Sequence, residues 1–408
     1  MPVTLIKHGT PEFRRTNLAL FSAGFATFAL LYCVQPLMPV FASDFHVSAA
    51  QASLSLSLTT GLLAPAMIVA GAISESRGRK SMMVVSLLSS SLLTIACAFA
   101  TRWQTLLAMR ALAGITFAGL PAISMAYLGE EVHPASIGLA MGLAIGGNGL
   151  GGMLGRLATS FITDALSWRW AMAAIGILGV IATAIFWRTL PPSRQFVPRE
   201  PRARALFETF RSQLRNSRLV PLFALGFLFM GSFVTTYNYV AYHLIEAPYS
   251  LSHAAAGAVF VVYPVGIFAS AFIGSRADRV GRPRMTQLMA MVMLAGVALM
   301  ATRSLVLVII GIATVTFGFF GGHSVVSSWI GLRTTHAKAQ ASALYLFFYY
   351  MGSSVLGSLG GTLWDRWRWP GVEVFLAALL AAALFMTTLL RSRDDTGATP
   401  TGASPAID

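Results

Sequence analysis

Two arginines lie inside long apolar stretches of this sequence, where a charge is costly. Arg110 falls within the apolar run 103–128, and Arg156 within the run 136–162. In hydrocarbon a charged side chain costs several kcal/mol unless it faces water or a partner. We therefore expect Arg110 to line a hydrated cavity, the alternative being a structural arginine bonded to carbonyl groups. Arg156 is near enough to the end of its run either to line the same cavity or to extend to the surface.

Carboxylates are absent from the middle of these runs. All 15 acidic residues fall between the runs or near their ends. With two arginines and no carboxylate, the cavity is predicted to be neutral or positive, which favours a neutral or anionic substrate over a cation. The sequence contains no HExxH or GxSxG motif and no intramembrane pair of acidic residues, so nothing in it indicates an enzyme. Cys33 and Cys97 lack metal-ligand spacing, so we expect neither a metal site nor a bound cofactor.

Titratable, polar and aromatic side chains supply further candidates. His243 and His323 titrate near neutral pH and are candidate proton carriers, with a hydrogen-bonded structural role as the alternative. The other candidates for lining the cavity are Tyr32, Gln35, Asn148, Tyr237, Asn238, Tyr345 and Tyr349. Tyr345 and Tyr349 are one helical turn apart and share a face. Aromatic residues near the end of a span can instead be interface anchors.

Membrane-spanning helices must position these residues. Hydrophobic residues make up 56% of the 408 residues and charged residues 11%, and the mean hydropathy is +0.69. A soluble domain averages about 25% charged residues. Runs of the ~20 apolar residues needed to cross a bilayer recur near 17–42, 52–73, 81–100, 103–128, 136–162, 169–188, 219–245, 253–274, 285–302, 305–330, 339–363 and 371–391. The predicted fold class is an all-α membrane protein with twelve transmembrane helices.

Basic residues are distributed unequally between the two sets of loops. Of the 29 lysines and arginines, 22 fall in the set that includes both termini and 5 in the other set. The positive-inside rule therefore places both termini in the cytoplasm, with the chain crossing the inner (plasma) membrane many times. Most of the net charge of +14 then faces the anionic lipid headgroups on the cytoplasmic side, and no nucleic-acid partner is expected.

The longest gap between spans predicts the division of the chain. Residues 189–218 are rich in proline and arginine and read as a cytoplasmic linker. The linker separates an N-terminal six-helix bundle at 17–188 from a C-terminal one at 219–391. Residues 1–16 are expected to be a cytoplasmic segment, and 392–408 a disordered cytoplasmic tail. Within the linker, residues 204–214 have the spacing of a basic amphipathic helix that lies on the membrane surface.

The loops after the second and eighth spans repeat one pattern. Each holds a glycine, an acid four positions later, a second glycine three positions after that, and basic residues: Gly71, Glu75, Gly78, Arg79 and Lys80 in the first, and Gly274, Asp278, Arg279, Gly281 and Arg282 in the second. The second glycines are 203 residues apart, which indicates duplication of a six-span unit. Both are expected to provide positive φ in a short turn. Glu130 and Glu131 are candidate partners of Arg79 or Lys80, the alternative being that the loops only set topology.

The run 136–162 is rich in glycine. Its candidates for close helix packing are Gly142, Gly146, Gly147, Gly151 and Gly152. Such a density would destabilise a soluble helix. In a membrane, small residues instead let helices approach closely.

These motifs resemble those of the major facilitator superfamily over nearly the whole chain. The two repeated loops resemble its GxLaDrxGrkxxL signature, with Glu75 in place of Asp in the first copy. The segments Leu106-x-x-x-Arg110, Gly147-Asn148-Gly-Leu-Gly151-Gly152 and Tyr32-x-x-Gln35-Pro36 are similar to motifs of its drug/proton antiporter branch, in particular the bacterial YnfM-type exporters. Two positions depart from the motifs of that branch: this sequence has Ala113 where the branch usually has glutamine, and Asn148 where it has proline.

The resemblance implies two pseudo-symmetric six-helix bundles that give alternating access to a central site. It implies that the repeated loops latch the bundles together on the cytoplasmic side, that Arg110 acts in proton coupling or substrate binding, and that the glycine-rich span flexes against the eighth. The favoured function is proton-coupled efflux, by a monomer, of a small neutral or anionic metabolite, sugar or drug-like compound. A proton-coupled or facilitative importer is the alternative, and a non-transporting membrane receptor or scaffold is the alternative of another class.

Overall fold

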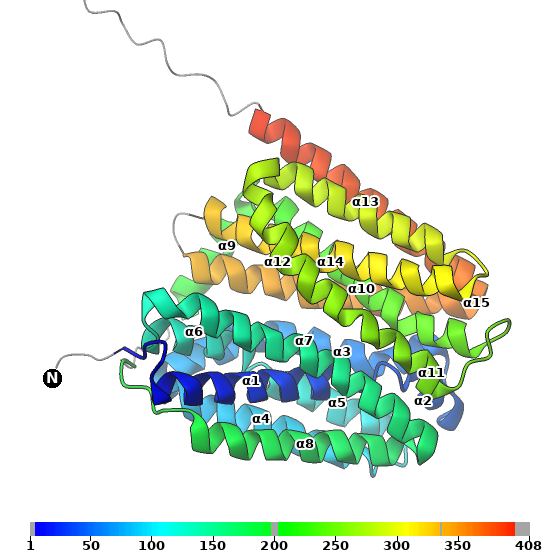
Figure 1. The fold of residues 1–408 in the computed structure, drawn as a ribbon, viewed down its shortest axis with the longest axis horizontal. Helices are drawn as coiled ribbons and strands as arrows, with labels where there is room; N and C mark the ends of the chain where they lie inside the picture. The colour runs from blue at the N-terminus through cyan, green and yellow to red at the C-terminus, as the bar shows by residue number, and fades with distance from the viewer. Residues whose placement is uncertain (1–4, 197–202, 335–336, 396–408) are drawn as a thin grey trace, which may run out of the picture.

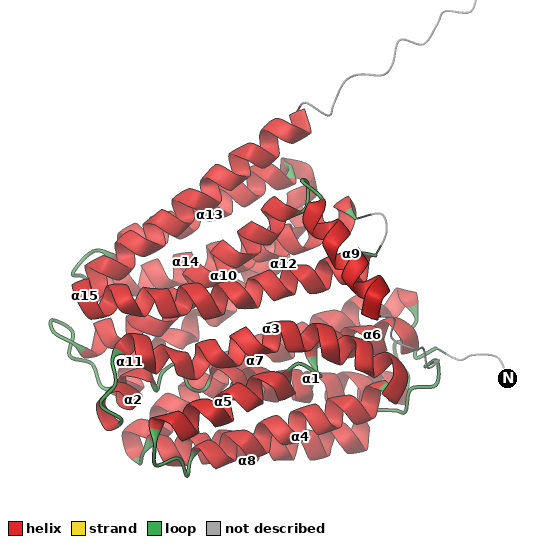
Figure 2. Cartoon of the chain, turned by 180° about the vertical axis from the view of Figure 1, so that it is seen from behind, coloured by secondary structure: helices red, strands yellow, loops and turns green. Residues whose placement is uncertain are grey.

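The computed structural model describes residues 5–196, 203–334 and 337–395, which are almost entirely helical. Figure 1 shows helices running back and forth between two ends of the molecule in two groups, with α1–α8 in one and α10–α15 in the other. Figure 2 shows the same groups from behind, with α9 at the end that also holds the N-terminus. Of the predicted tail 392–408, residues 396–408 lie outside the described residues, as do linker residues 197–202.

The first bundle contains α1 (Pro11–Tyr32), α2 (Met38–Asp44), α3 (Ala49–Arg77), α4 (Arg79–Cys97), α5 (Trp103–Phe117), α6 (Pro121–Glu131), α7 (Pro134–Ala165) and α8 (Trp168–Thr189). The predicted spans 17–42 and 103–128 are each interrupted, between α1 and α2 and between α5 and α6. Proline explains both interruptions, because Pro36, Pro39 and Pro121 have no N–H to donate and disfavour the helical conformation of the preceding residue.

The second bundle follows α9 (Ala203–Arg215), a helix in the predicted position within the linker. It contains α10 (Val220–Ile245), α11 (His253–Gly257), the 3₁₀ helix η1 (Ala258–Val262), α12 (Tyr263–Val280), α13 (Arg282–Met300), α14 (Leu305–Arg333) and α15 (Lys338–Asp395). The long α15 is two helices joined at a kink, where Arg368 has φ 55° and ψ −147°. These two helices are the predicted spans 339–363 and 371–391.

Twelve crossings result, six in each bundle. Nine of the described helices are long and apolar enough to span a membrane. One of them, α15, makes two crossings, and α1 and the α5–α6 pair supply the other two. The predicted fold class, an all-α membrane protein with two six-helix bundles, is confirmed.

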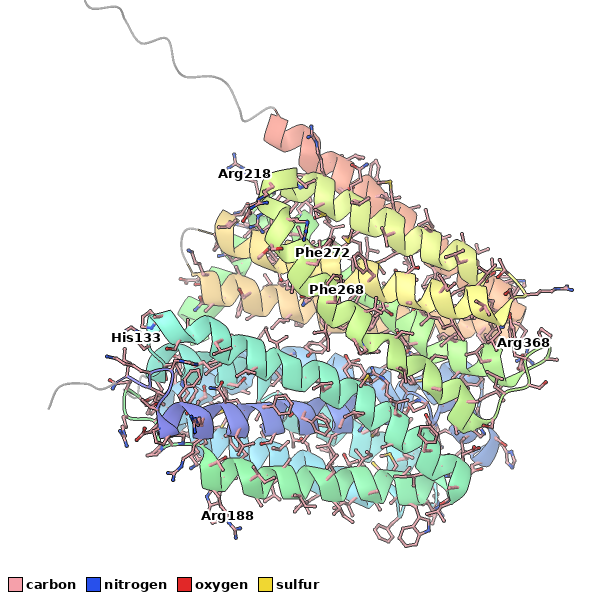
Figure 3. All side chains as sticks on the ribbon, in the orientation of Figure 1. His133, Arg188, Arg218, Phe268, Phe272 and Arg368 are labelled. Atoms are coloured by element: carbon pink, nitrogen blue, oxygen red, sulfur yellow. The ribbon has the colours of Figure 1, made fainter. Side chains whose placement is uncertain are left out.

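Large apolar side chains point outward along the crossings, as expected for a surface that faces lipid. Phe385 is 62% exposed and Phe268 is 58% exposed; Figure 3 shows Phe268 midway along the molecule. Trp170 and Trp187 are both exposed near opposite ends of α8. At 1.5 Å per residue they are about 26 Å apart along the helix, close to the ~30 Å thickness of the bilayer core.

The two ends of the molecule differ. Figure 3 shows Arg188 and Arg218 at one end, here called the basic end, and Arg368 at the other, here called the far end. The turns of the internal repeat join α3 to α4 and α12 to α13 at the basic end. As predicted, their glycines have positive φ, 91° at Gly78 and 92° at Gly281.

The bundles touch toward the far end. There Asp365 of α15 accepts hydrogen bonds from the N–H groups of Ala49 (3.0 Å) and Ala50 (3.2 Å) at the start of α3. Closer to the centre, the Ser354 hydroxyl donates to the Ser57 carbonyl at 2.7 Å. Figure 1 shows α7 and α12 converging toward the far end and separating toward the basic end.

Candidate functional site

A buried polar cluster lies where α1 is interrupted. Gln35 is in the turn between α1 and α2, and its Oε1 accepts a hydrogen bond from Nε of Arg156 on α7 at 2.7 Å. Nη1 of Arg156 donates to the carbonyl of Gly152, one turn earlier on the same helix, at 2.6 Å. Arg156 is only 2% exposed. Of the two roles left open for Arg156, the structure therefore favours the buried one, because the side chain does not extend to the surface.

Aromatic rings from both bundles surround the Arg156 guanidinium. Its central carbon lies 4.3 Å from the ring centroid of Tyr32, 4.9 Å from that of Tyr263 and 5.1 Å from that of Phe260. Distances within about 6 Å permit cation–π attraction, which is stronger when the groups are desolvated. Tyr32 ends α1, whereas Phe260 and Tyr263 belong to η1 and α12, so the cation lies between the bundles.

The cluster continues into the second bundle through an amide pair. Nε2 of Gln35 donates to Oδ1 of Asn238 on α10 at 2.7 Å, and both side chains are fully buried. Nδ2 of Asn238 is buried and has no hydrogen-bond partner among the described residues. An unpaired buried donor carries a free-energy cost, and here that cost falls at the contact between the bundles.

An aromatic wall connects Arg156 to the predicted histidine. Phe233 of α10 contacts the ring of Tyr263 and stacks on Phe319 of α14 at 3.9 Å between centroids. Phe319 in turn lies 6.0 Å from the ring of His323. These offset and edge contacts are the geometries that aromatic rings prefer. The polar cluster and His323 are therefore parts of one continuous site.

His323 is paired with the two tyrosines expected to share a helical face. Its Nδ1 is 2.7 Å from Oη of Tyr345, and its ring centroid is 4.9 Å from that of Tyr349. His323 and Tyr349 are both partly exposed, whereas Tyr345 is buried. The shared face of the tyrosines is confirmed, and α14 and α15 bring the imidazole within hydrogen-bond distance of a phenol.

Arg110, the sharpest single candidate in the sequence, lies elsewhere. Its three guanidinium nitrogens donate to the carbonyls of Ser55 (3.0 Å), Leu30 (3.1 Å) and Leu31 (2.7 Å), and the residue is 0% exposed. α1 ends one residue after Leu31, so its last carbonyls lack helical donors. Arg110 caps this end of α1 inside the first bundle, which is the carbonyl-bonded alternative. The expectation that it lines a hydrated cavity is not met.

Three other candidates occupy separate positions. Oδ1 of Asn148 lies against Gly24 of α1, within the first bundle. Tyr237 hydrogen-bonds Thr316 at 2.7 Å and stacks on Phe260, beside the cluster. His243 stacks on Trp369 at 4.5 Å near the far end. Of these three, only Tyr237 joins the Arg156 site.

The repeated loops make their contacts within their own bundles. Nη2 of Arg79 pairs with Glu130 at 2.6 Å, one of the predicted pairings. Glu131 instead accepts from the backbone N–H of Gln195 at 2.8 Å, and Lys80 donates to the Leu190 carbonyl at 2.5 Å.

In the second loop, Arg282 pairs with Asp278 at 2.6 Å and donates to Ser328 at 2.5 Å. Glu75 and Arg279 are exposed, Gly71 has open space beside it, and Gly274 faces Ser324 of its own bundle. A latch between the bundles stays a prediction for a conformation in which the basic end is closed.

The glycines of α7 divide into two groups. A Cβ added at Gly147 or Gly151 would lie 2.6 Å or 2.0 Å from a backbone carbonyl of α1, so these two permit close packing. At Gly152 it would lie 3.1 Å from Arg156 itself. Gly142 and Gly146 have open space, so their predicted packing role is wrong for this conformation.

Several aromatic residues of the site were not singled out from the sequence: Phe233, Phe260, Tyr263, Phe319 and Phe320. Apolar runs this rich in phenylalanine give no signal of their own. A usable signal exists on α1, where Phe21, Phe25, Phe28 and Tyr32 follow one helical face. The three phenylalanines are partly exposed, and the stripe leads to Arg156.

Comparisons with known proteins agree with this fold. A family model described as Major Facilitator Superfamily matches residues 20–330. The chain is 48% identical over 388 residues to a Bacillus subtilis protein named "Uncharacterized MFS-type transporter YybF", covering 95% of this chain and 96% of that one. It is 45% identical over 392 residues to "Inner membrane transport protein YnfM" of Escherichia coli, covering 96% and 94%. A solved bacterial homologue of the human lysosomal transporter Spinster, inward-facing and occupied, has a TM-score of 0.79 at 15% identity, covering 98% of this chain and 100% of that one.

Proposed function

Because this chain belongs to the major facilitator superfamily and is a secondary transporter of the inner membrane, we propose that it exports a small neutral or anionic compound in exchange for protons. The proton gradient supplies the energy, and a monomer holds the complete pathway. Candidate cargo is a metabolite, a sugar or a drug-like compound. The bundles alternate access by rocking around a central site.

The environment of Arg156 carries the proposal. It is a buried cation at the contact between the bundles, bonded to Gln35 and enclosed by three aromatic rings. Within the described part of the chain no carboxylate lies within ion-pair distance of it. A site with this charge repels cations and accepts neutral or anionic compounds.

Orientation follows from the basic end. Loops rich in arginine and lysine stay in the cytoplasm, so we place the basic end and both termini there. Because the bundles touch toward the far end and separate toward the basic end, the conformation described here is then inward-facing, and cytoplasmic cargo reaches the site between the separated helices.

His323 is the proposed proton carrier. Its pairing with Tyr345 and its position on the aromatic wall link it to the Arg156 cluster. When the site faces the periplasm, an imidazole there takes a proton from the more acidic side. Turning inward releases that proton.

Transport in vesicles tests the proposal. In inverted vesicles acidified inside, the chain should accumulate cargo, and collapse of the pH gradient should stop accumulation. His323→Gln should abolish the dependence on the gradient, whereas His46→Asn, at an exposed histidine with φ 51°, should not. Cargo that moves in the same direction as the protons, out of these vesicles, indicates the importer instead. Absence of transport for neutral, anionic and cationic compounds alike supports a receptor or scaffold.

A further inference from the structure

We infer that Arg156 recognises a single negative charge on a flat, aromatic substrate, an inference that rests on the proposed transport function and narrows it. In the part of the chain that the structure describes, the guanidinium has one nitrogen without a partner. Nε and Nη1 are engaged by Gln35 and Gly152, whereas Nη2 makes no hydrogen bond within the described residues. A carboxylate or sulfonate oxygen fits this position, because the N–H groups of Nη2 can donate a charge-assisted hydrogen bond to it.

The charge balance of the site specifies an anion. Arg79 and Arg282 each pair with an acid at 2.6 Å, but no such partner reaches Arg156 in the described chain. A buried cation without a counter-ion is unfavourable, and an anionic ligand removes that cost. Arg110 offers no second cation, since its three nitrogens already donate to carbonyls. One charge on the ligand therefore matches the site better than two.

The aromatic side chains around the site favour a substrate with a flat ring. Tyr32, Phe260 and Tyr263 lie around the cation, and Phe233, Phe319 and Phe320 extend the surface toward His323. Stacking between aromatic rings adds attraction beyond the burial of their area. An aliphatic ring of the same size gains only the burial. The site therefore distinguishes aromatic from aliphatic anions.

We place the approach to the site at the basic end. Partly exposed side chains lead inward from three helices: Phe21, Phe25 and Phe28 on α1, Phe320 and His323 on α14, and Tyr349 on α15. Gly142 and Gly146 of α7 leave open space at the same end. A flat ring can move along these faces while keeping stacking contacts.

Direct binding to the purified chain in detergent tests the inference. The probe is 2-naphthalenesulfonate, compared by calorimetry with cyclohexanesulfonate, neutral 2-naphthol, a naphthalenedisulfonate and 2-naphthylmethylammonium. The monosulfonate should bind best, each comparator being about tenfold weaker or more. Arg156→Gln should weaken its binding about 10- to 100-fold, the effect of losing a charged hydrogen bond. Arg169→Gln, an exposed arginine over Trp168, should leave it unchanged.

Two further variants keep the test decisive if Arg156→Gln does not fold. Arg156→Lys keeps the charge but loses the planar guanidinium and its Nη2 donor, so affinity should fall about tenfold. Tyr32→Leu should reduce the preference for the aromatic over the aliphatic sulfonate. Equal affinity for the cation or for 2-naphthol, or full affinity in Arg156→Lys, overturns the inference. If vesicles transport a neutral sugar and the chain does not bind the sulfonate, only this inference is overturned. If the chain binds the sulfonate and transports nothing, only the proposed function is overturned.

Discussion

The hydrogen bond between Gln35 and Asn238 joins two residues that occupy equivalent positions in the internal repeat. They are 203 residues apart, the same separation as Gly78 and Gly281. Equivalent positions of two repeats can touch only near the axis that relates them. This amide pair therefore marks the pseudo-symmetry axis, and it joins the two bundles beside Arg156.

Removing this bond should favour opening at the far end. Asn238→Ala deletes one buried hydrogen bond, worth about 1 kcal/mol, which shifts the conformational equilibrium roughly fivefold. Distances between spin labels at Val47 and Arg366, in a cysteine-free background, should lengthen in a larger fraction of molecules. Thr94→Ala, which removes a bond inside α4, is the control. An unchanged distribution in Asn238→Ala contradicts the expectation.

Asp365 should act as a second closure. Its carboxylate accepts the first N–H groups of α3 across the bundle contact, and such a cap contributes about 1 kcal/mol. Asp365→Ala should therefore speed labelling of a cysteine at the buried Ser57 position by a membrane-impermeant maleimide. Asp164→Ala, at an exposed acid on α7, should leave the labelling rate as in wild type.

Arg110 should matter for stability rather than for ligand affinity. Arg110→Gln leaves carbonyls of α1 and α3 without their charged donor, and each such bond contributes about 1.5–3 kcal/mol. Its melting temperature in detergent should fall far more than that of Thr94→Ala. In molecules that remain folded, naphthalenesulfonate affinity should equal wild type. A variant with normal stability and lost binding would return Arg110 to the substrate site.

Two glycines of one helix should respond oppositely to alanine. At Gly151 the new Cβ meets the Phe25 carbonyl at 2.0 Å, so α7 must move away from α1, at a cost of about 1–3 kcal/mol. At Gly142 the Cβ meets nothing, and alanine should be neutral or raise stability by up to about 1 kcal/mol. Thermal unfolding of both variants, measured side by side, checks this. Equal losses would show that packing at α1 does not decide the outcome.

Glu131, beyond the predicted span at the basic end, should give a pH-dependent stability. Burial raises the pKa of this carboxyl above its usual range, with Glu130 adding to the effect. The folded chain therefore holds a proton that the unfolded chain has lost, so stability should fall as pH rises from about 4.3 through the raised pKa. Glu131→Gln keeps an acceptor for Gln195 and should flatten this part of the melting-temperature profile. A slope unchanged by the substitution would assign it to another group.

The sequence predicts most of the fold because the relevant information is local. Spans follow from apolar length, the loop conformation at Gly78 and Gly281 from the repeat, and the shared face of Tyr345 and Tyr349 from helical spacing. The interruptions in α1 and α5–α6 were also signalled, by Pro36 and Pro121, but the apolar runs continue across them and obscured the signal.

The candidate site is predicted only in part because contacts between helices are not local. Gln35, Arg156 and Asn238 were each identified, yet nothing in their spacing shows that they bond to one another. Arg110 and Arg156 look alike in sequence, since both interrupt apolar runs. Their difference arises where α1 ends: its free carbonyls face α5 and engage Arg110, whereas the Gln35 side chain beyond the end faces α7 and engages Arg156.

The turn at 33–37 separates the movement of Gln35 from the stability of α1, two properties that a continuous helix would couple. Its backbone is held by hydrogen bonds between residues three positions apart. The Gln35 N–H donates to the Tyr32 carbonyl at 3.0 Å, and the Leu37 N–H donates to the Val34 carbonyl at 3.1 Å. Rearranging it moves Gln35 without unwinding the span that Arg110 anchors. Substitutions in this turn that spare Gln35 should therefore change the rate of transport while leaving the choice of cargo intact.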